Sequence, residues 1–233
     1  AFYEGEVAEA IVKATVAAKG KMSLEDLKNY KIKISDPVKG TYRGYEIYTA
    51  APPSSGGAHI IQILNILENY DMKNIPAGSV RYYHLLSESM KMAFADRAKF
   101  MGDPDFVKIP LNGVINKNYA KTLKAKIDET KSQEYTEGNP WNYESNETTH
   151  YSIIDKEGNI VAVTFTVNGV FASGVVADGT GILLNNEMDD FDTGHDKANS
   201  IQEYKKPLSS MSPTIILKDG KPVASLGGLG AQK

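Results

Sequence analysis

The sequence predicts an α+β protein in which helices come first and antiparallel strands follow. Apolar residues recur at three- and four-residue steps through the first half of the chain, as is typical of amphipathic helices. From about Pro140 onward, β-rich runs are separated by turn signals such as Glu157-Gly158-Asn159 and Asp219-Gly220. This order favours a layered fold in which helices cover one or both faces of an antiparallel sheet.

The first elements expected are two helices and a strand. The apolar spacing between Val7 and Ala18 predicts a helix that ends near Gly20. Ser23 and Asp26 have the spacing of a capping box, which opens a short second helix. Tyr42 to Thr49 alternates aromatic or β-branched residues with polar ones, so we expect a strand there.

The middle of the chain reads as helical. Residues 52–57, with the sequence Pro-Pro-Ser-Ser-Gly-Gly, break the preceding strand. Ile60 to Leu67 then predicts a strongly apolar helix, and Ser79 to Phe100 a longer one. Tyr119 to Lys131 is rich in lysine, and we expect a solvated outer helix. The inner face predicted for the long helix consists of Tyr82, Leu85, Leu86, Ser89, Met92 and Ala93.

The last third of the chain is expected to form strands. Tyr151 to Asp155 and Ile160 to Thr166 flank a turn and predict a hairpin. Gly181 to Leu184 is a short apolar strand. Thr214 to Leu217 and Pro222 to Ser225 predict a second hairpin.

Composition excludes several classes of protein. The chain has 233 residues and a net charge of −3 without a long basic run, which argues against a nucleic-acid partner. It has no cysteine, so disulfides, thiolate catalysis and cysteine-ligated metals are excluded. No stretch approaches the ~18–20 apolar residues of a membrane helix. The four histidines lack the spacing of a helical zinc site, and we predict no metal.

Both ends of the sequence look cut. The start, Ala1-Phe2-Tyr3, lacks an initiator methionine and the pattern of a signal peptide. The end, Ala231-Gln232-Lys233, directly follows a glycine-rich run. We therefore expect a segment of a longer protein, in which a targeting signal would lie outside this chain.

Four polar or glycine-rich clusters are candidates for chemistry. In chain order, their ordinary interpretations are strand residues, a turn cap, a loop and a turn. Composition alone favours these ordinary interpretations over functional ones. The functional interpretations are a hydroxyl nucleophile, a site for a ligand amine, a site for a carboxylate and an oxyanion hole. In chain order the clusters are residues 146–152, 185–190, 207–214 and 227–230.

Taken together, the motifs carry a resemblance. They are Tyr42-Arg43-Gly44-Tyr45, residues 52–57, Ala95-Asp96-Arg97, Gly102-Asp103-Pro104, Thr148-Thr149-His150-Tyr151-Ser152, residues 185–190 and residues 207–214. In this order and spacing the chain resembles the γ-glutamyltransferases (γ-glutamyl transpeptidases), of the N-terminal-nucleophile hydrolase superfamily. The resemblance covers nearly the whole chain. It implies an αββα sandwich of which an N-terminal and a C-terminal portion are missing.

The resemblance also implies a precursor that cuts itself between Glu147 and Thr148. Residues 1–147 would then be the mainly helical C-terminal part of a large subunit, and residues 148–233 the mainly β N-terminal part of a small subunit. Cutting frees an α-amine on Thr148 with an ordinary pKa near ~8, which can serve as the base for the adjacent hydroxyl. The neighbouring Thr149 would face the opposite side of a strand, and the family pattern places the cut before the first threonine.

Further roles follow from the same resemblance. Thr166 would orient the Thr148 hydroxyl. Backbone N–H groups of Gly230 and Ala231 would form the oxyanion hole, although the family often has a second glycine where this chain has Ala231. The residues that would bind the donor are Asn168, Glu187 and Asp190 at its α-amino group and Ser209 and Ser210 at its α-carboxylate. The family's carboxylate-binding arginine would lie upstream of residue 1.

The implied function is a self-processing γ-glutamyl transferase or hydrolase. It would act on glutathione and other γ-glutamyl amides through a γ-glutamyl-threonine ester, with water or an amino acid as acceptor and no cofactor. Relatives are mostly exported, so we expect an extracellular or periplasmic protein. Two alternatives stay open. One is a poly-γ-glutamate depolymerase or transferase of the same family, favoured by the short connection between Asp190 and Ser209. The other is a truncated precursor without activity.

Overall fold

The computed structural model describes residues 2–140, 155–169 and 171–227. The chain forms two compact units, and each of them draws on two separate stretches of sequence. The small unit comprises residues 1–34 and 165–190, and the large unit comprises residues 35–164 and 191–233. Both contain helices and antiparallel strands, as the α+β prediction requires. Within the described ranges, no helix is long and apolar enough to cross a bilayer.

Two helices and a short two-stranded sheet build the small unit. The elements are α1 (Glu6–Ala17), α2 (Leu24–Asn29), β3 (Val176–Ala177), β4 (Ile182–Leu183) and the 3-10 helix η3 (Glu187–Asp190). Ser23 caps α2 as predicted, because its Oγ accepts from Asp26 N–H at 3.2 Å and its own N–H donates to Asp26 Oδ2 at 2.8 Å. The buried Ala8 and Ile11 line one face of α1, and α1 packs against β3.

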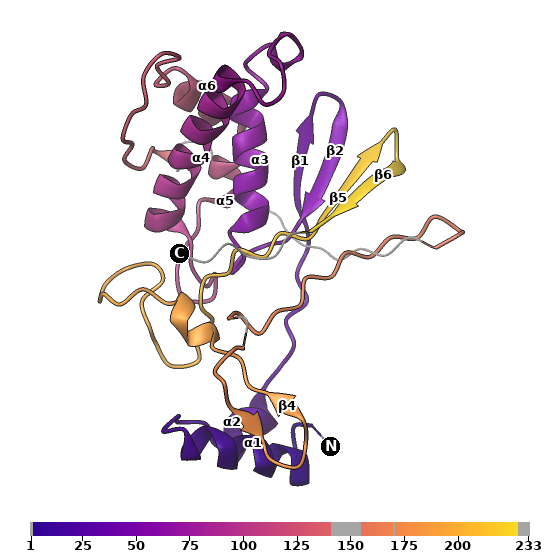
Figure 1. Ribbon diagram of the computed structural model, residues 1–233, viewed down its shortest axis with the longest axis vertical. Coiled ribbons are helices and arrows are strands. Elements are labelled where there is room, and N and C mark those ends of the chain that lie inside the picture. Colours follow the sequence, from indigo (N-terminus) through magenta and orange to yellow (C-terminus); the bar gives the residue numbers. More distant parts are fainter. Residues whose placement is uncertain (1, 141–154, 170, 228–233) are drawn as a thin grey trace. The chain divides into compact units, whose positions relative to one another are not determined.

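A four-stranded antiparallel sheet forms one layer of the large unit (Figure 1). Its strands are β1 (Val38–Tyr42), β2 (Tyr45–Thr49), β5 (Thr214–Lys218) and β6 (Lys221–Leu226), in the order β1-β2-β5-β6. The β2–β5 pair joins distant parts of the sequence, with Thr49 opposite Thr214. These two side chains are buried, and Thr214 Oγ1 donates to Thr49 Oγ1 at 3.0 Å.

The prediction of one strand from Tyr42 to Thr49 is wrong, because a two-residue turn divides this region into β1 and β2. Arg43 (φ 51°) and Gly44 (φ 82°) both adopt the left-handed region that such a tight hairpin turn requires. Arginine rarely adopts this conformation. Tertiary hydrogen bonds fix it here, since Arg43 N–H donates to Glu68 Oε1 at 2.6 Å and Nη2 donates to the Tyr70 carbonyl oxygen at 2.9 Å.

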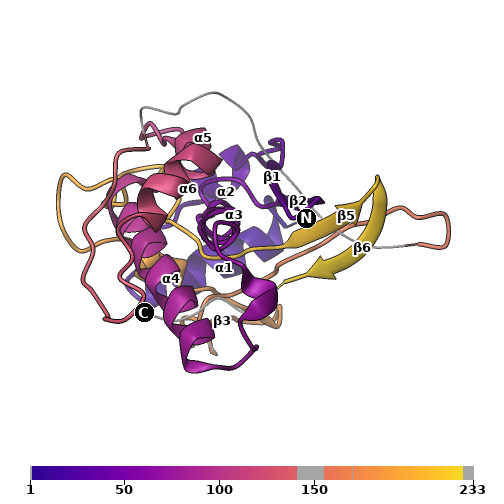
Figure 2. The same ribbon diagram turned by 90° about the horizontal axis from the view of Figure 1, so that it is seen from above.

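Helices form the second layer of the large unit. They are α3 (Gly56–Leu67), η1 (Met72–Asn74), α4 (Val80–Phe100), α5 (Leu111–Val114) and α6 (Lys117–Lys124). Helix α3 packs on β1, and α4 and α6 pack on α3 (Figure 2). Val38, Ile47 and Ile61 are buried between α3 and the sheet. The helices predicted near 60–67 and 79–100 are confirmed, and Ser79 caps α4.

Helix α6 departs from the expected solvated helix over 119–131. It ends at Lys124, and one of its faces is buried. Tyr119 and Leu123 pack with Ile66 of α3 and Met92 of α4 in a continuous apolar cluster. The prediction erred because the frequent lysines, which lie on the outer face, hid an apolar stripe at three- and four-residue spacing.

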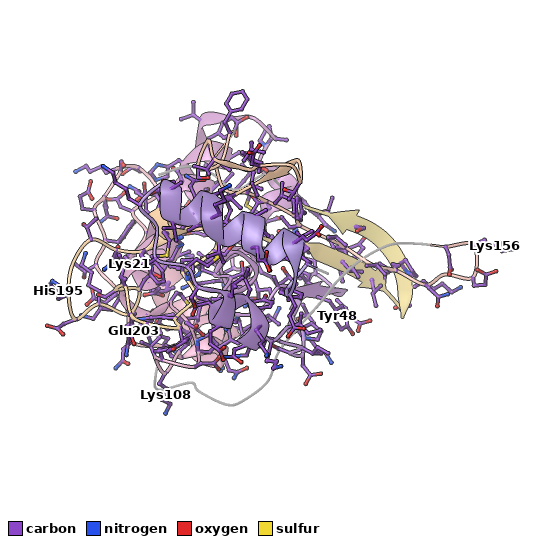
Figure 3. The ribbon with its side chains drawn as sticks, turned by 90° about the horizontal axis from the view of Figure 1, so that it is seen from below. Lys21, Tyr48, Lys108, Lys156, His195 and Glu203 are labelled. Atoms are coloured by element: carbon purple, nitrogen blue, oxygen red, sulfur yellow. The ribbon has the colours of Figure 1, made fainter. Side chains whose placement is uncertain are left out.

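The two predicted hairpins differ in outcome. The one around Asp219-Gly220 is confirmed as β5 and β6. At the other, the turn is present, with Asp155 N–H donating to the Asn159 carbonyl oxygen at 2.7 Å and Lys156 at the exposed tip (Figure 3). Residues 160–166, however, are not in a strand. A strand needs a ladder partner, and the partner predicted for it, residues 151–154, lies outside the described ranges.

Candidate functional site

The predicted site residues fall into three groups. Glu147, Thr148, Gly230 and Ala231 lie outside the described residues. Thr166, Asn168, Glu187 and Asp190 belong to the small unit. Ser209 and Ser210 belong to the large unit. The structure therefore describes two local arrangements, one in each unit.

In the small unit, residues 166–169 are joined to residues 185–190, and we call this arrangement the amide loop. Asn186 lies at its centre. Its Oδ1 accepts from Gly169 N–H at 2.7 Å, its Nδ2 donates to Asp189 Oδ2 at 2.8 Å, and its carbonyl oxygen accepts from Asn168 Nδ2 at 3.2 Å. One predicted residue, Asn168, is therefore bonded directly to the segment that carries two others, Glu187 and Asp190.

Thr166 and Asn168 form a tight turn within the amide loop. Asn168 has φ 71°, a left-handed conformation that asparagine tolerates better than most residues. Its N–H donates to Thr166 Oγ1 at 2.9 Å. Because the Thr166 oxygen accepts this bond, its hydroxyl hydrogen can be donated to a further acceptor. The geometry gives Thr166 a defined orientation.

The acidic end of the amide loop contains a helix cap and two neighbouring carboxyl groups. Asn185 Oδ1 accepts from Glu187 N–H at 3.0 Å and so caps η3, as composition favoured. Burial raises the pKa of the Glu187 carboxyl, and the nearby Asp190 charge raises it further. A cation bound beside these two carboxyls would relieve their repulsion.

In the large unit, three separate segments meet at Ser209 and Ser210, and we call this the serine junction. The Ser209 carbonyl oxygen accepts two bonds from Ser55, one from its N–H and one from its Oγ, both at 2.9 Å. Ser209 N–H in turn donates to the Pro53 carbonyl oxygen at 3.1 Å. From the last turn of α4, Arg97 reaches Ser55 Oγ at 2.9 Å through Nε and Ser210 Oγ at 3.1 Å through Nη2.

Glycine lets α3 approach the serine junction closely. A Cβ on Gly56 would lie 2.5 Å from the Ser210 carbonyl oxygen and 2.9 Å from Ser212 Cβ. Both distances are too short for ordinary contact. The breaker motif over 52–57 therefore supplies hydrogen bonds through its serines and space through its glycine.

The chain leading into the serine junction is anchored by buried polar groups. Asp103 is fully buried, and its Oδ2 accepts from Lys206 N–H at 2.8 Å. Asn199 Oδ1 accepts from Leu208 N–H at 2.8 Å. The short connection that precedes Ser209 is thus fixed at both of these points.

A buried network lies beside the junction and links α3 to α4 and α6. Asp96 accepts from Gln62 Nε2 at 2.6 Å, Tyr119 hydroxyl at 2.8 Å and Gly138 N–H at 2.8 Å. Burial raises the pKa of the Asp96 carboxyl, and these hydrogen bonds oppose the shift. Gln62 Oε1 lies 3.0 Å from His59 Nδ1. Burial lowers the pKa of His59 to about 4, which leaves the ring neutral near pH 7.

The other described histidines carry no comparable arrangement. His84 lies within 2.8 Å of the Asp128 carbonyl oxygen through Nε2. His195 is exposed on the loop that precedes Ser209, on the same side as Glu203 in Figure 3. Within the described ranges, no group of three or more His, Asp or Glu residues could hold a metal ion.

Sequence reasoning missed four residues of these arrangements. Ser54, whose Oγ donates to the Met211 carbonyl oxygen beside the serine junction, belongs with Ser55 and Arg97. All three sit in motifs that carried the resemblance, yet they received no role. Asn186 was seen only as part of an acidic and amide-rich cluster. The signal that could have found Ser54 and Ser55 is the hydroxyl pair directly before two glycines, since it combines donors with room for close approach.

Comparison with known proteins decides the family. The family model for gamma-glutamyltranspeptidase matches residues 1–233. The chain belongs to the gamma-glutamyltranspeptidase family. This confirms the resemblance carried by the motifs.

Individual gamma-glutamyltranspeptidase relatives give the extent of the match. The glutathione hydrolase proenzyme of Escherichia coli (strain K12) is 48% identical over 246 residues, covering 100% of this chain and 42% of that protein. The cephalosporin acylase structure from Bacillus halodurans matches with TM-score 0.84 and 26% identity, covering 96% of this chain and 40% of its own. The structure of Helicobacter pylori gamma-glutamyltranspeptidase matches with TM-score 0.55 and 45% identity, covering 57% of this chain and 38% of its own. The chain spans less than half the length of these relatives.

Proposed function

We propose that this chain is part of a self-processing γ-glutamyl transferase or glutathione hydrolase whose nucleophile is Thr148. The observation that carries the proposal is the family match over residues 1–233, because it includes every residue to which a role is given. The names of curated relatives, such as the E. coli glutathione hydrolase proenzyme, support both the substrate and the processing.

The proposed reaction has two halves. Thr148 Oγ1 bonds to the γ-carbonyl carbon of the donor, and its proton passes to its own α-amine and then to the leaving amine as the C–N bond breaks. Water or an amino acid then attacks the resulting ester and restores the threonine. Backbone N–H groups of Gly230 and Ala231 would hold the tetrahedral oxyanion, and losing one such donor typically costs ~10²–10³-fold in rate.

The family resemblance gives each of the two described arrangements a role of its own. Thr166 has a hydroxyl hydrogen to direct at Thr148 Oγ1, since its oxygen accepts from Asn168 N–H. Glu187, Asp190 and Asn168 would hold the donor ammonium on the amide loop. Ser209 and Ser210 would hold the α-carboxylate at the serine junction.

A cut at Glu147–Thr148 would leave two subunit parts, residues 1–147 and 148–233. Pairing of β2 with β5, Glu46 opposite Leu217 and Thr49 opposite Thr214, would join them. The α1–β3 packing would join them in the small unit as well. We also propose an exported location, on the basis of family resemblance.

Two alternative substrates have their own support. The short connection before Ser209 favours a poly-γ-glutamate substrate, since a longer lid would restrict a chain. The likeness to a cephalosporin acylase, TM-score 0.84, favours a different amide. Parallel assays of the complete gene product with glutathione, poly-γ-glutamate and a cephalosporin amide would rank the three.

The experiment that tests the nucleophile is a processing assay on the complete gene product. We expect a new fragment that begins Thr148-Thr149-His150 on N-terminal sequencing and turnover of glutathione. Thr148→Ala should stay uncut and inactive, whereas the neighbouring Thr149→Ala should still be cut. If Thr148→Ala is cut like the parent protein, or if only Thr149→Ala stays uncut, the assignment is wrong.

A further inference from the structure

Arg97 connects Ser55 to Ser210 in the serine junction. It lies in the last turn of α4, and its guanidinium contacts Ser55 Oγ at 2.9 Å and Ser210 Oγ at 3.1 Å. Ser55 is buried, and Ser210 is half-buried. A planar guanidinium presents its N–H groups in a fixed fork, so contacts to two hydroxyls set their separation as well as their positions.

The direction of these hydrogen bonds is fixed by chemistry. A guanidinium has only donors, so both serine oxygens must accept from Arg97. Each hydroxyl then points its hydrogen elsewhere. Ser55 directs its hydrogen to the Ser209 carbonyl oxygen at 2.9 Å. Ser210 keeps its hydrogen for an acceptor, and the adjacent positive charge makes the hydroxyl a stronger donor.

A carboxylate is the ligand that matches such a hydroxyl, because it only accepts hydrogen bonds and carries negative charge. We propose that Arg97 is the positioning residue of the donor α-carboxylate subsite, acting through Ser210. It orients the Ser210 hydroxyl as a donor and adds positive charge behind it. This inference rests on the proposed function, which places the α-carboxylate at Ser209 and Ser210.

The alternative is that Arg97 only fastens α4 to the loop. The two roles predict different kinetics. A fastening role would lower the amount of folded, processed enzyme and leave the KM of the surviving enzyme unchanged. A positioning role would raise the KM for a γ-glutamyl donor in fully folded enzyme. It would also make the effect of Arg97 depend on the presence of the Ser210 hydroxyl.

The test is a double-mutant cycle in the complete, processed gene product with γ-glutamyl-p-nitroanilide as donor. Arg97→Gln should raise KM about 10–100-fold, the range expected when a charge-assisted hydrogen bond is lost. Ser210→Ala should raise KM comparably. The double variant should be no more than about twofold worse than Ser210→Ala alone. The control Arg81→Gln, at an exposed arginine on the same helix, should stay within about twofold of the parent.

Arg97→Lys keeps the charge but cannot make the forked contact, so it should raise KM about 3–10-fold. If Arg97→Gln fails to fold or to be processed, the KM of Arg97→Lys is the measurement that tests the inference. A parent-like KM in the folded Arg97 variant would overturn the inference. A double variant whose increase in KM equals the product of the two single increases would also overturn it. A parent protein that processes but does not turn over the γ-glutamyl donor would instead overturn the proposed function itself.

Discussion

The serine junction and the amide loop hold their residues in different ways. Contacts at the serine junction join residues far apart in sequence, 113 positions for Arg97 with Ser210 and 154 for Ser55 with Ser209. In the amide loop, the hydrogen bonds of Asn186 to Val167, Asn168 and Gly169 span 17 to 19 positions, and the side-chain bonds among them are half-buried. The junction is thus a product of tertiary folding, whereas the loop is organised locally. Changes at the junction should affect stability and binding together, and changes in the loop should affect mainly binding.

The largest effect is expected at Gly56. Gly56→Ala places a methyl group 2.5 Å from the Ser210 carbonyl oxygen, and backbone cannot move aside as a flexible side chain can. Overpacking of this kind costs about 2–3 kcal/mol of unfolding free energy. We expect a matching drop in the urea midpoint of the complete gene product and a raised KM for the donor.

Gly194→Ala is the matched control. The nearest atom to its added Cβ is the end of the Lys197 side chain at 2.9 Å, which can rotate away. Its urea midpoint should stay close to that of the parent. Equal effects of the two substitutions would show that the close approach at Gly56 has no special cost.

An intermediate effect is expected from acid, because a buried histidine lies beside the junction. Burial lowers the pKa of His59 from 6.5 to about 4 in the folded state, so the unfolded chain binds a proton more readily between these values. The stability that His59 contributes is therefore complete above pH 6.5 and is lost as the pH falls toward 4. The loss between pH 7 and pH 5 amounts to about 2 kcal/mol.

His59→Gln should remove this acid sensitivity. Urea unfolding of the complete protein at pH 7 and pH 5 would measure it, with His195→Gln, an exposed histidine on a loop, as the control. The drop in unfolding free energy from pH 7 to pH 5 should shrink in the His59 variant and not in the control. An unchanged drop would mean that His59 takes up its proton in the folded state as readily as in the unfolded chain.

Most of the secondary structure followed from local patterns, because capping residues and apolar spacing act within a few positions. Ser23 and Ser79 marked two helix starts correctly. The errors came where tertiary contacts decided the outcome. Arg43 adopts its turn because of Glu68 and Tyr70, which lie 25 and 27 positions away.

The same distinction applies to the candidate site. The motifs identified the family, and through it the residues with expected roles. They could not show that Arg97 contacts Ser210, because that contact depends on where α4 ends relative to a loop more than a hundred positions later. Asn186 was missed for a different reason, since an amide beside acids looks like an ordinary turn cap.

The smallest effect on stability is expected at Asn186, which tests the other side of the comparison. Asn186→Ala removes the bonds to Gly169 N–H and Asp189, and because these groups are half-exposed, water can replace the side chain. We expect a loss of about 1 kcal/mol or less in unfolding free energy. The KM for a γ-glutamyl donor should nevertheless rise several-fold, since the turn that carries Asn168 loses the side-chain bond from Gly169 to the segment of Glu187 and Asp190. Asn74→Ala, at an exposed asparagine whose Nδ2 donates to the nearby Asp71 Oδ2 at 2.6 Å, is the control and should leave KM unchanged. If Asn186→Ala lowers the urea midpoint as much as Gly56→Ala does, the amide loop is as much a part of the folding core as the serine junction, and the contrast between the two is wrong.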